Sequence, residues 1–183
     1  IVMEWYILEY SPSGELAFFA GGGPETSPPC DGVLLDHWGG FFAQGIDVDA
    51  SGNIYVADTR ANVVFRIEQN KIVRVVAGAY PWLDIFNYED GVPPRGATID
   101  FPMDVKVSPR GDVFYLDAGE DRREDGGEYA SVARKVSQDW FTLNEDTIVG
   151  DNILIPDADG SGLVVTPGGQ HLQTIDLRTK TVL

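Results

Sequence analysis

The fold of this protein can be predicted from residues 45–78, GIDVDASGNIYVADTRANVVFRIEQNKIVRVVAG. In this stretch β-branched and aromatic residues alternate with polar ones, and Gly, Asn and Asp separate the runs, which is typical of short β-strands. We expect four of them, at Gly45–Asp49, Ile54–Ala57, Val63–Glu68 and Lys71–Val76. Four antiparallel strands in about 35 residues form one sheet that cannot bury both of its faces alone. The chain should therefore repeat this unit.

Landmarks of this stretch recur 59 residues later in the chain. Asp104–Asp117 aligns without a gap on Gly45–Asp58, and the linker motif Asp-Gly-Val stands at 31–33 and again at 90–92. After the second strand pair the next hairpin is delayed by about ten residues, because a charged insertion occupies Ala118–Tyr129. Linkers and strands that stay in phase indicate a repeat protein.

The sequence predicts a single all-β domain over residues 1–183, a β-propeller with about three and a half four-stranded blades. We place the outer strand of the third unit at Trp140–Leu143 and a short linker at Asn144–Asp151. The predicted units are a half-blade at 5–21 and blades at 45–78, 102–143 and 152–183.

Composition limits the classes of partner. The net charge of −16 argues against binding of nucleic acid through phosphates and against an anionic membrane surface. Cys30 is the single cysteine, so no disulfide can form within the chain. No apolar run approaches the roughly 20 residues that cross a bilayer. The chain starts at Ile1 in a strand-like pattern, which indicates a segment of a longer protein, and we expect an extracellular or cell-surface location.

The stretch GIDVDASGNIYVADTRANVVFRI, followed by IVRVVAG, resembles an NHL repeat. The linker EDGVPPRGATIDFPMDV resembles the connection in NHL proteins of secreted bacterial and plant type and in teneurin-like propellers. The resemblance is most specific over residues 31–117, while Lys106, Leu116 and Thr166 depart from the repeat pattern. It implies a six-bladed ring. Further chain, another polypeptide or a second copy would then supply the remaining blades.

Long linkers and the insertion are expected to share one face of the disc, whereas the opposite face carries only tight turns. Binding residues concentrate on long loops held by a rigid scaffold. We therefore predict that aromatic and charged side chains of these loops bind a protein or polymer partner. The candidate binding residues are Asp36, Trp38, Trp82, Phe86, Tyr88, Glu120, Asp121, Arg122, Arg123, Glu124 and Asp125.

Other recurring residues are interpreted as structural. Phe41, Phe42 and Phe101 precede inner strands and are expected to pack between blades. Asp58 and Asp117 end equivalent strands, and we expect each carboxylate to accept hydrogen bonds from the backbone of the following turn.

A calcium loop is the metal site that the sequence suggests. Asp47, Asp49 and Ser51, with Asp58 at the last ligand position, superficially match such a loop. Lys106 aligns with Asp47, however, and alternation along a strand does not wrap side chains around an ion. These residues are therefore interpreted as strand and turn, and no cofactor is predicted.

The preferred hypothesis is a non-catalytic scaffold that presents an acidic and aromatic face to its partner within a larger assembly. No Ser-His-Asp arrangement, phosphate loop or Cys/His cluster is visible in the sequence, and His37 and His171 are its only histidines. The alternative is a metal-dependent hydrolase or lyase of the kind found among gluconolactonase, paraoxonase and hydroxyglycine-lyase propellers. Such an enzyme would be active only when its ring is complete.

Overall fold

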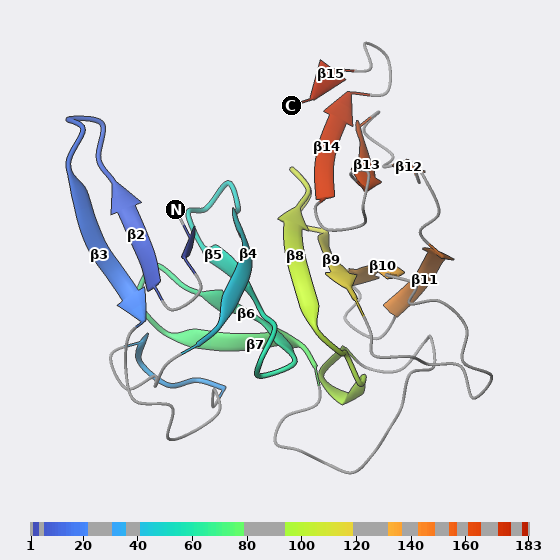
Figure 1. Cartoon of the computed structure of the whole chain (residues 1–183), viewed down its shortest axis with the longest axis horizontal. Helices are drawn as coiled ribbons and strands as arrows, with labels where there is room; N and C mark the ends of the chain where they lie inside the picture. The colour runs from blue at the N-terminus through green and yellow to red at the C-terminus, as the bar shows by residue number, and fades with distance from the viewer. Residues whose placement is uncertain are drawn as a thin grey trace.

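Four antiparallel sheets follow one another along the part of the chain that the structure describes (Figure 1). The structure is a computed structural model. It describes residues 2–3, 6–21, 31–35, 41–78, 94–118, 132–136, 143–148, 154–156, 161–165, 172–176 and 181–182. In each sheet the strands lie in chain order, as the hairpin-rich sequence predicts. The all-β prediction is therefore confirmed.

The first sheet has three described strands and each of the others has four. The strands of the first two sheets are β1 (Val2–Met3), β2 (Tyr6–Tyr10), β3 (Leu16–Gly21), β4 (Ala43–Val48), β5 (Ile54–Asp58), β6 (Val63–Ile67) and β7 (Val73–Ala77). Those of the third and fourth are β8 (Pro102–Val107), β9 (Val113–Asp117), β10 (Val132–Val136), β11 (Leu143–Ile148), β12 (Leu154–Pro156), β13 (Ser161–Val165), β14 (Leu172–Asp176) and β15 (Thr181–Val182). A 3₁₀ turn, η2 (Pro94–Gly96), precedes β8.

Strand pairing reproduces the sequence repeat residue by residue. Ile46 pairs with Val56 in β4–β5, and the residues 59 positions later pair in β8–β9. A bulge follows Ala43 in β4 and recurs after Pro102 in β8. The last unit, whose sequence repeat is weaker, keeps the same register. Ile54 pairs with Ile67 in the second sheet, and the residues 108 positions later, Gly162 and Ile175, pair in the fourth.

Two details of the prediction are wrong. The outer strand of the third sheet is β11, so residues placed in a linker form a strand instead. An edge strand pairs on one side only and tolerates polar residues, which is why the sequence Leu-Asn-Glu-Asp-Thr-Ile was a poor strand signal. The first unit also has a third strand, β1, paired with β2.

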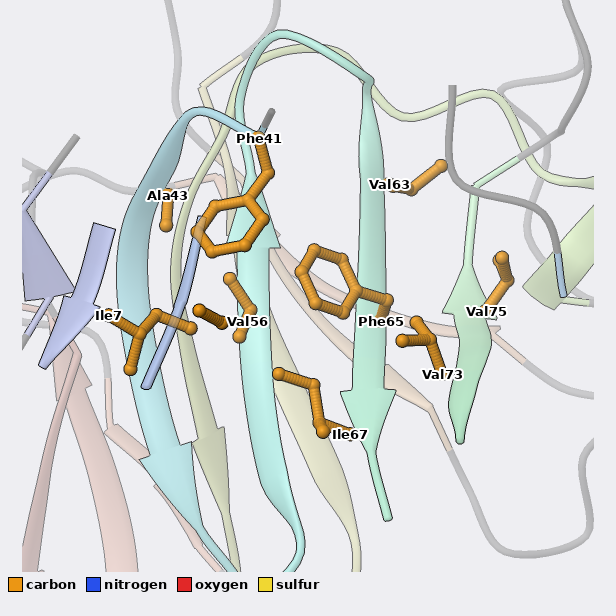
Figure 2. Packing of buried hydrophobic residues seen from close by; sticks show 10 residues of the cluster. Ile7, Phe41, Ala43, Val56, Val63, Phe65, Ile67, Val73 and Val75 are labelled. Atoms are coloured by element: carbon orange, nitrogen blue, oxygen red, sulfur yellow. The ribbon is translucent and has the colours of Figure 1, made fainter. Parts of the chain in front are cut away.

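The second sheet lies between the first and the third (Figure 1), and each of its faces carries a cluster of buried apolar residues. One face packs against the first sheet, because Ile7 and Ala20 of that sheet join its apolar cluster. The ring centroids of Phe41 and Phe65 lie 5.9 Å apart in this cluster, and Figure 2 shows these rings beside Val56 and Ile67. The other face packs against the third sheet through residues such as Tyr115. The prediction that one unit cannot bury itself is confirmed.

Of the three linker phenylalanines, only Phe41 is fully buried. Phe42 is half-buried, and Phe101 is 47% exposed, so the expectation that Phe101 packs between blades is wrong. The Phe101 backbone adopts a left-handed conformation with φ of 52°. Its amide donates to the Asn62 side chain at 3.0 Å, and its carbonyl accepts from Ala118 at 3.2 Å. These two bonds fix a conformation that leaves the ring exposed.

The first strands of the second and third sheets, β4 and β8, lie side by side. Asp47 Oδ2 accepts a hydrogen bond from the Val107 amide at 2.8 Å, so a side chain of one sheet binds the backbone of the next. A Cβ placed on Gly45 would lie 2.4 Å from the Asp104 Cα atom. Glycine is therefore required where the two strands approach each other.

Gly45→Ala should destabilise the protein by about 1–3 kcal/mol, because the added methyl group overlaps the backbone of β8. Gly96→Ala is the matched control, since a Cβ there meets no atom within 4 Å. Urea unfolding of the two variants and the parent measures the difference. Equal stability of both variants would show that β4 and β8 are not in this contact.

Candidate functional site

The residues predicted to bind a partner lie outside the part of the chain that the structure describes. They are Asp36, Trp38, Trp82, Phe86, Tyr88 and the run Glu120, Asp121, Arg122, Arg123, Glu124 and Asp125. Their grouping on one face stays a prediction from the sequence.

Asp58 has the structural role predicted for it. Its Oδ1 atom accepts hydrogen bonds from the amides of Arg60 at 3.1 Å and Ala61 at 3.0 Å, which closes the turn after β5. The same oxygen accepts from the Phe42 amide at 3.3 Å, so the carboxylate also holds the preceding linker. Burial raises the pKa of Asp58, although the three amide bonds act in the opposite direction.

Asp117 repeats part of this arrangement in the third sheet. Its Oδ1 atom accepts from the Asp100 amide at 3.0 Å, which ties the linker to the end of β9. Its Oδ2 atom lies 3.4 Å from the Arg134 Nε atom, and both side chains are almost fully buried. The pair is closed to solvent, which identifies it as part of the framework.

The carboxylates of the suggested calcium loop are bound to protein amides. Asp49 Oδ1 accepts from the amides of Ser51 and Asn53, each at 2.9 Å, and thereby closes the turn between β4 and β5. Asp47 accepts from its neighbour Val48 at 2.9 Å and from Val107 on β8. Within the described ranges no group of three or more His, Cys, Asp or Glu residues could hold a metal ion. The carboxylates of this loop therefore do not fit a metal, and no chemistry is assigned to one.

A cavity of about 550 Å³ lies between the second and third sheets. Its walls are the two tight turns after β4 and β8 and the facing side chains of the two sheets. The residues that line it are Asp49, Ala50, Ser51, Tyr55, Arg66, Val76, Ser108, Pro109, Arg110, Gly111, Val113 and Val136. Volumes of this size suit small-molecule ligands. The cavity is therefore the candidate functional site, on the face that the sequence predicted to carry only turns.

Three of the charged or titratable groups that line this cavity are linked to one another. The Tyr55 hydroxyl donates to Asp49 Oδ2 at 3.4 Å, and Arg66 is the cross-strand partner of Tyr55. Burial raises the pKa of Tyr55, and Arg66 partly offsets this effect. Burial also acts to raise the pKa of Asp49, but bonds from Asn53, Ser51 and Tyr55 outweigh it and lower the pKa.

These shifts determine what the cavity can do. Asp49 stays ionised and Tyr55 stays protonated around neutral pH, so neither is poised to exchange a proton there. For Arg66, burial acts to lower the pKa, but the contacts with Tyr55 and Glu68 prevail and raise it, so the guanidinium is permanently charged. The site thus combines the fixed positive charge of Arg66 with the carboxylate of Asp49, which suits binding of a polar ligand.

One signal could have revealed this site from the sequence. Arg66 interrupts the otherwise apolar strand Val63–Ile67, and in strand alternation it falls on the same face as Val64, towards the next sheet. A charge on a face that packs against a neighbour indicates a cavity or a partner. The turn residues Ser108 and Arg110 had no such signal.

Comparison with known proteins identifies the fold. No family model matches the sequence. Teneurin-1 from Homo sapiens is 30% identical over 149 residues, which is 75% of this chain and 5% of teneurin-1. A solved structure assigned as a gluconolactonase matches 92% of this chain and 51% of its own, with a TM-score of 0.53 and 17% identity. A gluconolactonase from Xanthomonas campestris matches 98% and 53%, with a TM-score of 0.57 and 12% identity.

The chain therefore has the fold of a partial β-propeller and spans about half the length of these two structures. The finding overturns the preferred hypothesis of a non-catalytic scaffold, because the propellers that match almost the whole chain are described as enzymes. The alternative hypothesis, a propeller hydrolase, is the better supported of the two.

Within the described residues, no helix is long and apolar enough to cross a membrane.

The effect of Arg66 on Tyr55 can be measured. Arg66→Gln should raise the Tyr55 pKa further above its ordinary value of 10.0, because a neighbouring positive charge that favours the phenolate is lost. Asp49→Asn should have the opposite effect. Ultraviolet titration of each variant against its Tyr55→Phe counterpart isolates this one tyrosine, and circular dichroism at each pH confirms that the protein stays folded. An unchanged Tyr55 pKa in Arg66→Gln would contradict the geometry.

Proposed function

We propose that this chain is part of an NHL-type, six-bladed propeller that hydrolyses a lactone. One observation carries the proposal: the two gluconolactonases match 92% and 98% of this chain, so the likeness extends over the whole array of sheets. Because the chain spans 51% and 53% of those proteins and supplies about three and a half blades, a six-bladed ring would need about two and a half more. Teneurin-1 supports the NHL-type repeat, since it is similar over 75% of the chain.

The outer face of the first sheet supports a ring that continues beyond it. Tyr6 and Tyr10 of β2 and Leu16 and Phe18 of β3 are 44%, 63%, 56% and 61% exposed. Tyr10 pairs with Leu16 across the two strands, and the rings of Tyr6 and Phe18 lie 6.1 Å apart. A contiguous exposed apolar face of this kind marks a surface that another element covers. In a propeller, a neighbouring blade is the element that fits.

The residues of this chain would contribute the framework of the central channel. Strands β4 and β8 are the first strands of their sheets and lie against each other. The Lys106 side chain of β8 donates from Nζ to the Ile46 carbonyl oxygen of β4 at 3.5 Å. In the reverse sense, the Asp47 side chain of β4 accepts from the Val107 amide of β8. These contacts cross-link the two strands. In the proposed enzyme the groups that act on the lactone are therefore expected mainly from the other blades.

Lactone hydrolysis by the full-length protein tests this proposal. Glucono-δ-lactone should be hydrolysed with saturable kinetics and well above its spontaneous rate, which an indicator of acid release follows directly. An open-chain ester of similar size serves as a control for nonspecific ester cleavage. Gly45→Ala should lower the rate in proportion to the loss of folded protein, whereas Gly96→Ala should not change it.

A rate equal to the spontaneous one, with sheets and thermal transition intact, would contradict the hydrolase. That result would not contradict the propeller fold, which rests on the sheet order and the structural matches. An extracellular location and a protein or polymer partner remain predictions from the sequence.

A further inference from the structure

A second cavity, about 580 Å³ in volume, adjoins the first at Arg66 and opens between β7 and the linker before β8. Its lining combines three arginines with an apolar wall. The lining residues are Asp31, Arg66, Arg74, Val75, Val76, Pro94, Arg95 and Val136. Three guanidinium groups around one cavity stand out in a chain whose net charge is −16. The charge of this cavity is thus opposite to that of the protein.

The two arginines of the sheet are placed against each other. Arg66 on β6 and Arg74 on β7 are direct cross-strand partners. Like charges in this relation destabilise a sheet. Glu68 offsets part of the repulsion, with its Oε1 atom 2.7 Å from Arg66 Nη2 and 3.7 Å from Arg74 Nε. One carboxylate between two guanidinium groups leaves positive charge uncompensated.

The third arginine brings its own counterion. Arg95 donates from Nη1 and Nη2 to the two oxygens of Asp31, at 3.1 and 2.9 Å, and from Nε to the Val75 carbonyl at 2.9 Å. Asp31 also accepts from the Val75 amide at 3.0 Å. The two residues therefore form a rim of the cavity on which their charges cancel. Asp31 has little capacity left for Arg74.

Arg74 is the group that this arrangement leaves for a ligand. Among the described residues its ion-pair contacts are long, 4.0 Å from Nη1 to Asp31 and 3.7 Å from Nε to Glu68. Its Nη1 atom lies close to Gly32, where a Cβ would be 3.0 Å away, so the lack of a side chain at Gly32 leaves room for the guanidinium. The buried Nε atom of Arg66 has no hydrogen-bond partner within the described residues. A buried donor without a partner favours a charged acceptor, and the Arg74 side chain, which is 39% exposed, is accessible to one.

We propose that this cavity binds a small organic carboxylate. The carboxylate group accepts hydrogen bonds from Arg74, since Glu68 occupies the position between the two arginines of the sheet, and its carbon skeleton packs on Val76, Pro94 and Val136. A planar guanidinium binds a carboxylate through two parallel hydrogen bonds, which a compact cation cannot do. The apolar wall selects against an anion without a carbon skeleton. The site is separate from the channel and does not depend on the proposed lactonase activity.

Calorimetric titration of the full-length protein with benzoate tests the proposal. Benzoate should bind with a dissociation constant of about 1 mM or tighter. Benzamide, which has the same skeleton without the charge, should bind at least about tenfold more weakly. Arg74→Gln should weaken benzoate binding by about tenfold or more. Arg60→Gln removes the same charge from the turn after β5 and should leave the affinity unchanged.

Each other outcome overturns the proposal. Absence of saturable benzoate binding refutes the site, and equal affinity in Arg74→Gln refutes the assignment of the arginine. Inorganic phosphate that binds as tightly as benzoate refutes the role of the apolar wall. The comparisons of benzoate with benzamide and with phosphate need only the unmodified protein, so the test holds even if Arg74→Gln does not fold.

Discussion

The blade depends on the hydrogen bonds that three backbone amides donate to the buried carboxylate of Asp58. Asp58 stands at the end of β5, is 1% exposed, and accepts amides from both the turn that follows and the linker that precedes the sheet. Burying a charge is costly unless hydrogen bonds replace the water it loses. Three backbone donors supply that replacement here, and they fix the chain at the point where it leaves the second strand. Asp117 repeats the arrangement towards its own linker, so the repeat is one of hydrogen bonding as well as of sequence.

The blades then stabilise one another. The second sheet has an apolar cluster on each face, and the first and third sheets cover them. Asn62 extends this coupling, because its side chain binds the amide of Phe101 and lies 3.3 Å from Asp100 in the next linker. The Thr59 hydroxyl donates to the Pro102 carbonyl at 2.8 Å and joins the same two units. Separating the second and third blades would break these bonds together with the core, which makes a cooperative unit of the pair.

Much of the fold could be predicted because it follows from local pattern and exact repetition. The 59-residue interval predicted that β4–β5 and β8–β9 pair in the same register. The ten-residue insertion predicted that β10, the partner of β9, begins later in the chain than the equivalent strand of the second sheet. The outer strand β11 was missed because an edge strand needs no apolar alternation. Phe101 was misplaced because its left-handed backbone depends on Asn62, a contact between blades that no local pattern contains. The cavities were missed for a similar reason: Arg66 and Arg74 are neighbours in one hairpin, but Arg95 and the residues of the third sheet join them only when the chain folds. The loop residues proposed from the sequence lie outside the described ranges.

Amide hydrogen exchange around Asp58 tests the central claim most directly. In the unmodified protein the amides of Phe42, Arg60 and Ala61 should be protected, since a single carboxylate accepts all three. Asp58→Ala should expose these three amides selectively, while the amide of Val56 in the β5 ladder keeps its protection, and Asp58→Asn should retain part of the effect through its remaining oxygen. Unchanged protection of the three amides in Asp58→Ala would contradict the account, because some other group would then be holding the linker and the turn.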